Sequence, residues 1–336
     1  MGHNITLIHG DGIGPEVISS AIKVIEATGI DINWDIVEAG ENAIKSHGIP
    51  LPDYVINSIE NNKVALKGPV TTPVGKGFRS INVGLRQGLN LFANIRPIKS
   101  YEGVDSLHKD VDFIIVRENT EDLYAGIEHR IGEDAAESIK IITRKASERI
   151  CRYAFELAKK EGRKKVTLAH KANIMKLSDG LFLECGRKIS EEYKDIEFED
   201  IIIDAMCMKL VQFPQDYDII VAPNLYGDIL SDLSAGLIGG LGLAPGANIG
   251  EEIAVFEPVH GSAPDIAGKN IANPTSAILS GIMMIKHIGE LETANKIEKA
   301  LIDTLKDENC RTIDLGGSLG TKEFTEEIIN RMETSI

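Results

Sequence analysis

The chain has 336 residues, of which 43% are hydrophobic and 26% charged, and its formal net charge is −15. This length allows two domains or one extended α/β domain, and the composition is that of a globular protein rather than a disordered one. The acidic balance argues against nucleic acid as a partner, because a phosphate-binding surface needs clustered Lys and Arg. An anionic small substrate stays possible where basic residues gather locally.

The sequence contains no apolar run long enough to span a bilayer, so we expect no membrane partner. The first residues, Met1 to Leu7, enter a strand at once and lack the basic and apolar regions of a signal peptide. The four cysteines form no Cys-x-x-Cys pair, so neither a thiolate metal site nor a disulfide framework is indicated. We therefore expect a cytoplasmic protein.

Short β-branched runs alternate with segments of helical period along the chain, which is typical of an α/β fold. The predicted strands are 5–8, 32–37, 63–66, 113–116, 165–168, 201–203, 219–221 and 253–256. Four of them end in polar residues, namely Arg117-Glu118-Asn119, His170-Lys171, Asp204 and Asn224. Ligands of open α/β sheets bind beyond the carboxyl ends of strands, so these endings are candidates to converge on one cleft. For any single ending, a helix cap or an exposed loop is the simpler explanation.

Two Gly-rich segments resemble nucleotide-binding motifs without matching them. Gly10 to Glu16 follows a strand and precedes a helix, but its third glycine comes one residue too early for G-x-G-x-x-G. Gly236 to Gly250 lacks the Gly-Lys-Ser/Thr ending of a P-loop, and as a loop between helix and strand it needs no ligand. Neither segment is interpreted as a classical dinucleotide or P-loop motif.

A basic stretch at residues 67–97 contains no acidic residue, although the chain has 51 of them. Arg is the side chain best suited to bind carboxylates with two hydrogen bonds. Ser80, Asn82 and Arg86 fall at helical spacing, so one face would offer a hydroxyl, an amide and a guanidinium. Arg117 would add another guanidinium if the strand ends converge. The alternative is a surface helix whose Arg pairs with a Glu elsewhere.

The segment Asn224 to Asp232 follows a buried strand and opens a predicted helix. Asp228 and Asp232 are four residues apart, so both carboxylates lie on one helix face and repel each other unless a cation separates them. Oxygen ligands favour a hard ion such as Mg²⁺ or Mn²⁺. The alternative is a solvated helix start, where the macrodipole favours a carboxylate.

These motifs together resemble the β-decarboxylating hydroxyacid dehydrogenases, the family of isocitrate, isopropylmalate and homoisocitrate dehydrogenases, over essentially the full length. The motifs are Gly10 to Glu16, Arg117 to Tyr124, His170 to Asn173, Asn224 to Asp232, and His260 to Gly268. Ser80 and Asn82, followed by Arg86, are similar to the members that use isocitrate, together with the segment Tyr124 to Glu128. Isopropylmalate enzymes carry apolar residues at the positions of Ser80 and Asn82.

The resemblance implies a large α/β domain formed by residues 1–91 and 239–336 and a smaller α/β domain formed by residues 92–121 and 144–238. Residues 122–143 would form a short clasp across the interface of a homodimer with shared active sites, or of a larger oligomer. The implied reaction is the oxidation of isocitrate to 2-oxoglutarate and CO₂ with reduction of NAD.

The resemblance also implies roles for individual residues. The substrate-binding set is Ser80, Asn82, Arg86, Arg96, Arg117, Tyr124, Lys171 and Asn173, and the metal ligands for Mg²⁺ or Mn²⁺ are Asp228, Asp232 and the partner subunit's Asp204. Lys171 and Asp204 would assist removal of the hydroxyl proton as hydride leaves for the nicotinamide. Tyr124, acidified by nearby positive charge, would then protonate the enolate that remains after CO₂ departs.

The cofactor would lie around residues 260–273. Its implied binding residues are Thr71, His260, Gly261, Ser262, Ala263, Pro264, Asp265, Ile266 and Asn273. NADP-dependent relatives carry Lys and Tyr at the positions of Asp265 and Ile266, and Ile313 and Gly317 stand at the apparent positions of a further Tyr and Arg. We therefore predict NAD.

Other functions stay open at this point. A homoisocitrate or 3-isopropylmalate dehydrogenase is the nearest alternative, and a non-catalytic regulatory subunit is a second. The regulatory alternative is disfavoured because all expected catalytic and metal-binding residues, namely Tyr124, Lys171, Asp204, Asp228 and Asp232, are present. A plain metal-binding module would not explain the arginines.

Overall fold

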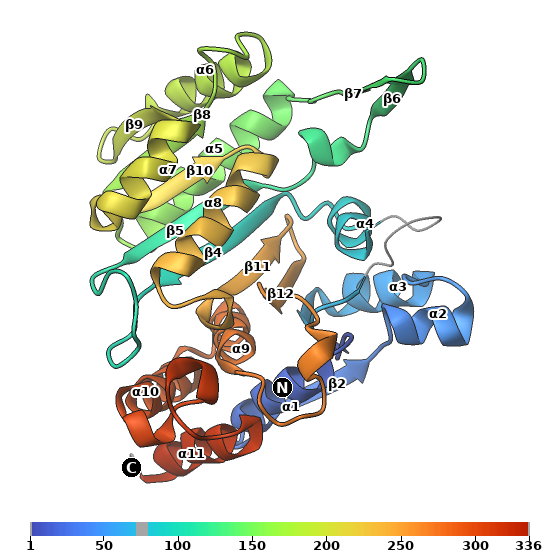
Figure 1. The fold of residues 1–336 in the computed structure, drawn as a ribbon, viewed down its shortest axis with the longest axis vertical. Helices are drawn as coiled ribbons and strands as arrows, with labels where there is room; N and C mark the ends of the chain where they lie inside the picture. Colours follow the sequence, from blue (N-terminus) through green and yellow to red (C-terminus); the bar gives the residue numbers. More distant parts are fainter. Residues whose placement is uncertain (1, 72–79, 335–336) are drawn as a thin grey trace.

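A computed structural model describes residues 2–71 and 80–334, and within them ten strands form one mixed sheet in the order β2-β1-β3-β12-β11-β4-β5-β10-β8-β9 (Figure 1). The strands of this sheet are β1 His3–Ile8, β2 Ile32–Ile36, β3 Val64–Lys67, β4 Ala93–Lys99, β5 Asp112–Glu118, β8 Lys165–His170, β9 Glu197–Ile202, β10 Ile219–Ala222, β11 Pro245–Ile249 and β12 Ala254–Pro258. A separate hairpin pairs β6 Glu128–Ile131 with β7 Ala135–Ser138.

The sheet changes direction at its centre. Strands β2, β1, β3 and β12 are parallel to one another, and so are β5, β10, β8 and β9. Between these groups β11 runs antiparallel to both β12 and β4, and β4 runs antiparallel to β5. The carboxyl ends of the two parallel groups therefore lie at opposite edges of the sheet. All four strand endings singled out in the sequence belong to the second group, so they share one edge.

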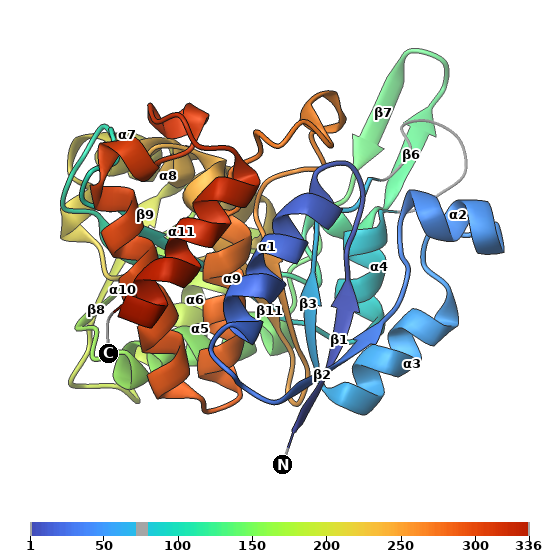
Figure 2. The ribbon, with the colours of Figure 1, turned by 90° about the horizontal axis from the view of Figure 1, so that it is seen from below.

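Helices cover both faces of the sheet (Figures 1 and 2). The α-helices are α1 Gly14–Glu26, α2 Glu41–His47, α3 Asp53–Asn62, α4 Ile81–Gly88, α5 Arg144–Lys160, α6 Ser178–Ser190, α7 Ile203–Gln212, α8 Asn224–Leu237, α9 Thr275–His287, α10 Leu291–Lys306 and α11 Thr321–Thr334. The short 3-10 helices are η1 Leu123–Ala125, η2 Pro214–Asp216, η3 Leu241–Leu243, η4 Pro264–Ile266, η5 Glu308–Cys310 and η6 Ile313–Leu315. One half of the sheet is covered by a group of helices that pack together, namely α1, α9, α10 and α11. Over the other half, α5 packs against α6, and α7 packs against α8. No helix of the described residues is long and apolar enough to cross a membrane.

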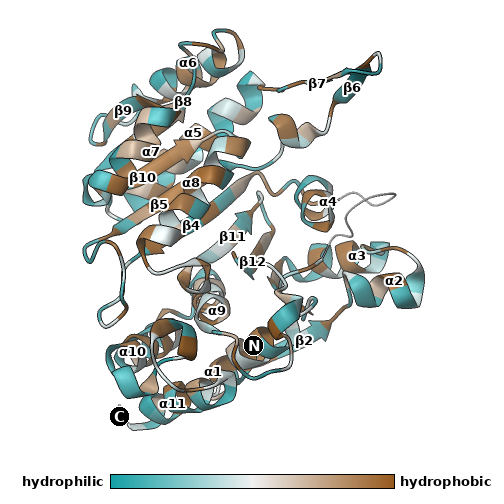
Figure 3. Cartoon of the chain, viewed as in Figure 1, coloured by the Kyte–Doolittle hydropathy of each residue, from teal (hydrophilic) through white to brown (hydrophobic). Residues whose placement is uncertain are grey.

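The hydrophobic core extends through both halves. Strands β5 and β10 are hydrophobic along most of their length and lie between helices, as Figure 3 shows. Helix α9 is buried almost throughout, including Ile278 and Met284, because it packs against β11 and β12 and also against α1 and α10. This packing holds the central strands, which carry the polar residues described below, in fixed register.

The hairpin of β6 and β7 projects from the body of the molecule (Figures 1 and 2), and all eight of its strand residues are exposed. It lies within residues 122–143, the segment for which a clasp is predicted. Its role in a dimer stays a prediction, as does the division of the chain into two domains. The strands of the two expected domains do form two contiguous halves of the sheet, joined by the pairing of β11 with β4.

The α/β prediction is confirmed, with several corrections. Two central strands, β4 and β11, are absent from the predicted set, and β11 occupies part of the segment Gly236 to Gly250 that the sequence analysis interprets as a loop. Lys63 adopts a left-handed conformation (φ 65°) and precedes its strand instead of beginning it. Arg117 and Glu118 lie inside β5 rather than after it. Residues 72–79 of the basic stretch lie outside the described residues.

Candidate active site

Three arginines from different elements gather in the interior near the junction of the two halves. Arg86 lies on α4, Arg96 on β4 and Arg117 near the end of β5, and their exposed fractions are 8%, 6% and 1%. Burial and the other two arginines, opposed by Glu257, together lower the pKa of Arg96 to about 10. Burial followed by Arg117 also lowers the pKa of Arg86. These three guanidinium groups are thus close enough for Arg117 to lower the pKa of the other two, and Arg96 stays charged at neutral pH.

Only part of this positive charge is balanced by the protein. Glu257 on β12 is 5% exposed, and its carboxylate lies 2.6 Å from Lys67 Nζ on β3 and 3.7 Å from Arg86 Nη2. Burial raises the pKa of Glu257, but Lys67, Arg86 and Arg96 outweigh burial and hold it at about 2. Glu257 is thus ionised, and this single carboxylate contacts both Lys67 and Arg86.

Several buried polar atoms near the arginines lack a partner among the described residues. They include Arg96 Nη1, Arg117 Nη2 and the side-chain oxygen of Asn82. A buried charged donor without a hydrogen bond is costly, so its presence in a folded protein indicates a ligand or water at that place. Asn82 and Arg86 are one turn apart on α4 and share a face. Ser80 precedes the helix and makes no side-chain cap, so the predicted common face holds for Asn82 and Arg86 only.

The start of α8 connects the arginines to the predicted metal site. Asp228 accepts hydrogen bonds from Arg117 Nη1 and from the Tyr124 hydroxyl, while Arg117 Nε donates to Asn224 Oδ1 (2.9 Å). The guanidinium of Arg117 also lies 5.0 Å from the centre of the Tyr124 ring. Burial and the hydrogen bond to Asp228 raise the pKa of Tyr124, although Arg117 acts in the opposite direction. The expectation that positive charge acidifies Tyr124 is therefore wrong for the protein without substrate.

Asp232 lies one helical turn after Asp228, as predicted. Burial and the charge of Asp228 raise the pKa of Asp232. For Asp228, burial acts upward, but Arg117 and the other cationic or hydrogen-bonding neighbours lower the pKa. Two carboxylates on adjacent turns, one disfavoured in its charged form by the other, suit a hard divalent cation. Within residues 2–71 and 80–334, no group of three or more His, Cys, Asp or Glu side chains is close enough to hold a metal ion.

Lys171 and Asp204 form an ion pair on another part of the same sheet edge. Lys171 follows β8, and Asp204 lies at the start of α7, directly after β9. The Asp204 side chain is 69% exposed, and the hydrogen bond from Lys171 lowers its pKa. Across the part of the chain that the structure describes, no hydrogen bond or ion pair joins these residues to Asp228. Asn173 is exposed nearby in sequence.

The first Gly-rich segment packs against the predicted cofactor segment. Ile13 N donates to Ser262 O (2.8 Å), and Thr71 Oγ1 donates to Ser262 Oγ (2.8 Å). Asp11 accepts from the backbone N–H of Thr71 (2.7 Å) and is 5% exposed. Gly12 has φ +58°, and a Cβ there would come within 1.9 Å of Ser262 O. The segment is thus no Rossmann motif, but it holds two of the predicted cofactor residues in place, a role that the sequence analysis missed.

The other predicted cofactor residues lie along the loop after β12. His260 is partly buried, and burial lowers its pKa. Ile266 is half-buried at the end of η4. Four others are exposed, namely Gly261, Ala263, Pro264 and Asp265. Asn273 Nδ2 donates to Asp314 (3.0 Å), which brings the segment containing Ile313 and Gly317 beside this loop. A Cβ at Gly317 would lie 2.2 Å from Arg311 O, so an arginine there would not fit this backbone.

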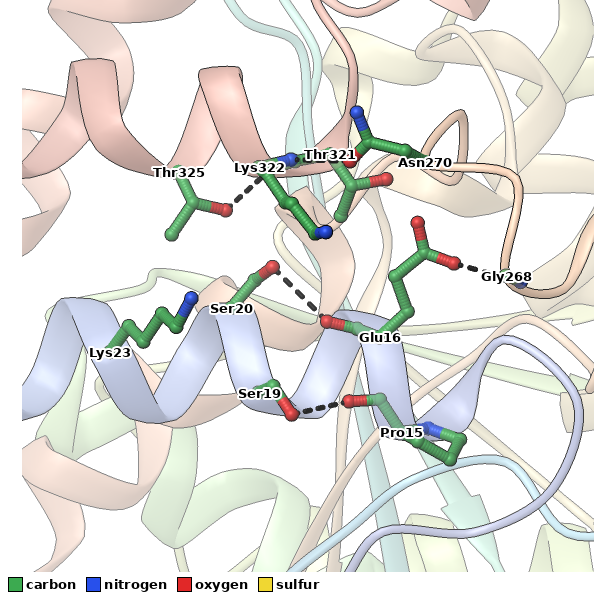
Figure 4. Close-up of a pocket in the computed structure, with 10 residues that line it drawn as sticks. All are labelled: Pro15, Glu16, Ser19, Ser20, Lys23, Gly268, Asn270, Thr321, Lys322 and Thr325. Carbon is green, nitrogen blue, oxygen red and sulfur yellow. Dashed lines mark hydrogen bonds between the residues drawn. The ribbon is translucent and has the colours of Figure 1, made fainter.

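A separate cavity of about 340 Å³ lies between α1 and the start of α11 (Figure 4). Its lining residues are Pro15, Glu16, Ser19, Ser20, Lys23, Gly268, Asn270, Thr321, Lys322 and Thr325. The hydroxyls of Ser19 and Ser20 donate to carbonyl groups of their own helix, and Gly268 N donates to Glu16. The predicted substrate, metal and cofactor residues do not line this cavity, so we place the candidate site at the arginines instead.

A model of the isocitrate/isopropylmalate dehydrogenase family matches residues 4–328. The chain belongs to the isocitrate/isopropylmalate dehydrogenase family. Its fold matches the crystal structure of isocitrate dehydrogenase from Methylococcus capsulatus with a TM-score of 0.95 and 56% sequence identity, covering 98% of this chain and 99% of that one. This family membership accounts for the arginines, the paired aspartates and the loop after β12 occurring together.

Two members of the isocitrate/isopropylmalate dehydrogenase family show how similar catalytic and regulatory proteins are. Isocitrate dehydrogenase (NAD) catalytic subunit 5, mitochondrial, of Arabidopsis thaliana is 51% identical over 328 residues, which are 97% of this chain and 88% of that protein. A mitochondrial isocitrate dehydrogenase (NAD) protein of Dictyostelium discoideum, which is named as regulatory, is 50% identical over 333 residues, covering 99% and 92%. Identity alone therefore does not separate the two roles.

These relatives overturn one expectation. The first residues predict a cytoplasmic location, but the relatives at 47–51% identity are named as mitochondrial proteins. The reason for the error is that the lack of a signal-peptide pattern and of Cys-x-x-Cys pairs excludes some locations without identifying one.

The sequence analysis missed Glu257, Asn94 and Asn248, which contact the arginines, and it named Asn224 only as a polar strand ending. Glu257 could have been identified from the sequence, because an acidic residue inside the apolar run Val255 to Pro258 needs a cationic partner if that run is buried.

Proposed function

We propose that this chain oxidises isocitrate to 2-oxoglutarate and CO₂, with NAD as the hydride acceptor and Mg²⁺ or Mn²⁺ as the metal. The observation that carries the proposal is the buried arginine group, in which Arg96 Nη1 and Arg117 Nη2 lack partners among the described residues. Isocitrate has three carboxylates, and buried guanidinium groups are the donors that best match carboxylate geometry. The names of the catalytic relative and of the bacterial structure support the same substrate.

The distal carboxylate would be bound at the start of α4. Asn82 shares a face with Arg86, and the hydroxyl of Ser80 is not used to cap the helix. Two polar groups beside a buried arginine favour a polar substituent over the isopropyl group of isopropylmalate. This is why we favour isocitrate over the 3-isopropylmalate alternative.

Asp228 and Asp232 fit a divalent metal because both are oxygen donors and the charge of one raises the pKa of the other. A third carboxylate would come from the partner subunit's Asp204 in a homodimer. When bound, the metal acts as a Lewis acid on the substrate oxygen and carbonyl. The exposed position of Asp204, and its separation from Asp228 on one chain, support a shared site.

The proton transfers would use two side chains of different character. Lys171 and Asp204 would together assist removal of the proton from the substrate hydroxyl in the neighbouring site. Tyr124 has a raised pKa, so its hydroxyl keeps its proton at neutral pH and is available as a proton donor to carbon. Asp228 accepts the hydrogen bond from that hydroxyl and so fixes its orientation.

NAD would lie along the loop after β12, with Thr71 and Ser262 near its nicotinamide end and Asp265 near the adenosine ribose. The carboxylate of Asp265 accepts hydrogen bonds from ribose hydroxyls and repels a 2′-phosphate. The close backbone at Gly317 supports the same preference, because it leaves no room for an arginine.

A direct assay tests the proposal. The purified chain is incubated with isocitrate, Mg²⁺ and NAD, and absorbance of NADH and release of CO₂ are measured, with homoisocitrate and 3-isopropylmalate as competing substrates. We expect isocitrate to have the highest kcat/KM. Higher turnover of another acid would contradict the substrate proposal.

A regulatory role is the second candidate, because a relative of 50% identity is named as regulatory. It predicts binding of isocitrate without turnover in any combination of metal and cofactor. Turnover by the chain alone would exclude it.

A further inference from the structure

The side-chain amide of Asn248 lies at the centre of the buried polar network beneath the arginines. It is 2% exposed, on β11, directly opposite Asn94 of the antiparallel strand β4. Residues opposite each other in an antiparallel pair place their side chains on the same face. The reversed strands at the middle of the sheet therefore bring these two amides together.

Asn248 makes four hydrogen bonds that join four elements. Its Oδ1 accepts from Arg86 Nε (3.2 Å), Asn94 Nδ2 (2.8 Å) and Asn119 Nδ2 (3.0 Å). Its Nδ2 donates to Glu257 Oε1 (2.7 Å). Three donors face one end of the amide and a carboxylate faces the other, so only one orientation of the amide satisfies them.

The network extends to a second arginine through Asn94. The Oδ1 of Asn94 accepts from Arg96 Nε at 2.6 Å. Both Arg86 and Arg96 are thus bound by their inner Nε atoms. A planar guanidinium held at Nε presents its terminal nitrogens outward, in the geometry that binds a carboxylate.

The amide is also suited to this place because it is neutral. Glu257 lies 3.7 Å from Arg86 Nη2 and contacts Lys67 directly. A second carboxylate at position 248 would compete with the substrate for the arginines, and an apolar side chain would leave three donors unpaired. An asparagine binds the inner nitrogen of Arg86 without neutralising the charge.

We propose that Asn248 is a positioning residue, which through its own bond to Arg86 and through Asn94 to Arg96 sets the orientation of the guanidinium groups that bind the substrate carboxylates. This inference rests on the proposed function, since the arginines are taken to bind the substrate. The proposed function does not by itself require Asn248. The positioning role does, because it makes the affinity for isocitrate depend on a residue that does not touch the substrate.

The test uses Asn248→Ala in the full chain with its metal and both substrates. We expect the KM for isocitrate to rise by about tenfold or more, because two arginines lose their fixed orientation, while the KM for NAD changes by less than about twofold. Titration calorimetry of isocitrate without NAD should show the same loss of affinity. A merely structural role would change thermal stability and leave the KM for isocitrate as it is.

Two further variants make the result decisive. Asn94→Ala releases only Arg96, so it should raise the KM for isocitrate by a smaller factor, about threefold, and it carries the test if Asn248→Ala does not fold. Ser280→Ala is the matched control, because Ser280 is also buried and accepts from Gly246 N on β11 (3.4 Å) but its bonds lie outside the network.

The outcomes separate the two proposals. Unchanged isocitrate affinity in folded Asn248→Ala and Asn94→Ala, with a wild type that turns over isocitrate, would overturn the positioning role and leave the proposed function standing. A wild type without isocitrate turnover or binding would overturn both.

Discussion

The buried arginines and the exposed pair of Lys171 and Asp204 represent two different ways of preparing charged groups for a substrate. Arg86, Arg96 and Arg117 are held by neighbouring side chains and include nitrogens without a partner among the described residues. Lys171 and Asp204 instead bind each other at the surface. The first group is held in place within one chain, whereas the second would have to exchange its partner before it could act as proposed. Under the proposed function, the arginines would bind the substrate within one chain, whereas Lys171 and Asp204 would act only in an assembly of chains.

Replacing Arg117 by alanine tests the buried side of this comparison and has the largest expected effect. The change leaves Asp228 and Asn224 without their cationic partner and removes a proposed substrate ligand. Losing two charge-assisted hydrogen bonds to a carboxylate, at about 1.5–3 kcal/mol each, should lower kcat/KM by about 10²–10⁴. Steady-state kinetics measure this, with Arg152→Ala as control, because Arg152 pairs with Glu192 at the surface. A fall of less than about tenfold would contradict a central role for Arg117.

Mixing two inactive variants tests the role of the exposed pair of Lys171 and Asp204. If each site takes Lys171 from the neighbour, a heterodimer of Lys171→Ala and Asp228→Ala chains has one site with both groups intact. Random exchange makes half of the dimers mixed, so activity should recover to about a quarter of wild type. Separately purified parents serve as controls. Continued inactivity after exchange of chains, verified by native mass spectrometry, would show that each chain forms its own site.

Substrate preference tests what the polar residues beside the buried Arg86 bind. Replacing Ser80 by valine and Asn82 by leucine removes the polar groups beside Arg86, so the distal carboxylate loses partners. We expect kcat/KM for isocitrate to fall by about 10²-fold, because an unpaired charged group in a closed site is costly. The same double variant should use 3-isopropylmalate relatively better. Unaltered kinetics with isocitrate would show that the distal carboxylate binds elsewhere.

The choice between NAD and NADP tests the effect of an exposed charge, that of Asp265. Asp265 should repel a 2′-phosphate, and two unit charges about 4 Å apart interact by about 4 kcal/mol at an effective dielectric of about 20, which solvent and salt reduce. NAD should therefore be preferred over NADP by about tenfold in kcat/KM. Asp265→Lys with Ile266→Tyr should narrow or reverse the ratio. A wild type that favours NADP would refute the assignment of this loop.

Acid stability gives the smallest expected effect. Glu257 has an ordinary pKa of 4.5 and a pKa of about 2 in the folded chain. Because the folded value is lower, the stabilisation is fully present above pH 4.5 and is lost as the pH falls toward 2. By about pH 4 the loss is about 1 kcal/mol. Urea unfolding at about pH 7 and about pH 4 should show a smaller difference for Glu257→Gln than for wild type, and equal differences would count against this ionisation.

The strands with an apolar composition could be predicted from the sequence. The two strands that carry Asn94, Arg96 and Asn248, namely β4 and β11, were missed. Strands β5 and β10 were recognisable from β-branched runs, and the helix carrying Asp228 and Asp232 from its spacing. Strand β4 was missed because Arg96 and Pro97 interrupt its pattern, and β11 because its glycine and proline resemble a loop.

The contacts around the arginines could not be predicted from local sequence at all. Asn248 meets Asn94 through strand register over a long separation along the chain, and Glu257 meets Lys67 in the same way. Propensity and spacing describe neighbours in sequence, whereas these contacts depend on which strands become neighbours in the sheet. The Tyr124 prediction failed for a related reason: its burial and its bond to Asp228 depend on tertiary packing.

The reversed centre of the sheet also has a consequence for how the protein is made. Strand β3 finds its neighbour β12 only about 190 residues further along the chain, since Val64 pairs with Ala254. At typical synthesis rates of about 5–20 residues per second, the edge of β3 waits for about 10–40 seconds without its partner. The bonds of Asn248 to Arg86 and Asn94 also form late in synthesis, because β11 emerges immediately before β12. Newly made chains therefore expose an open strand edge during synthesis and gain the proposed substrate site only after β11 and β12 have been made.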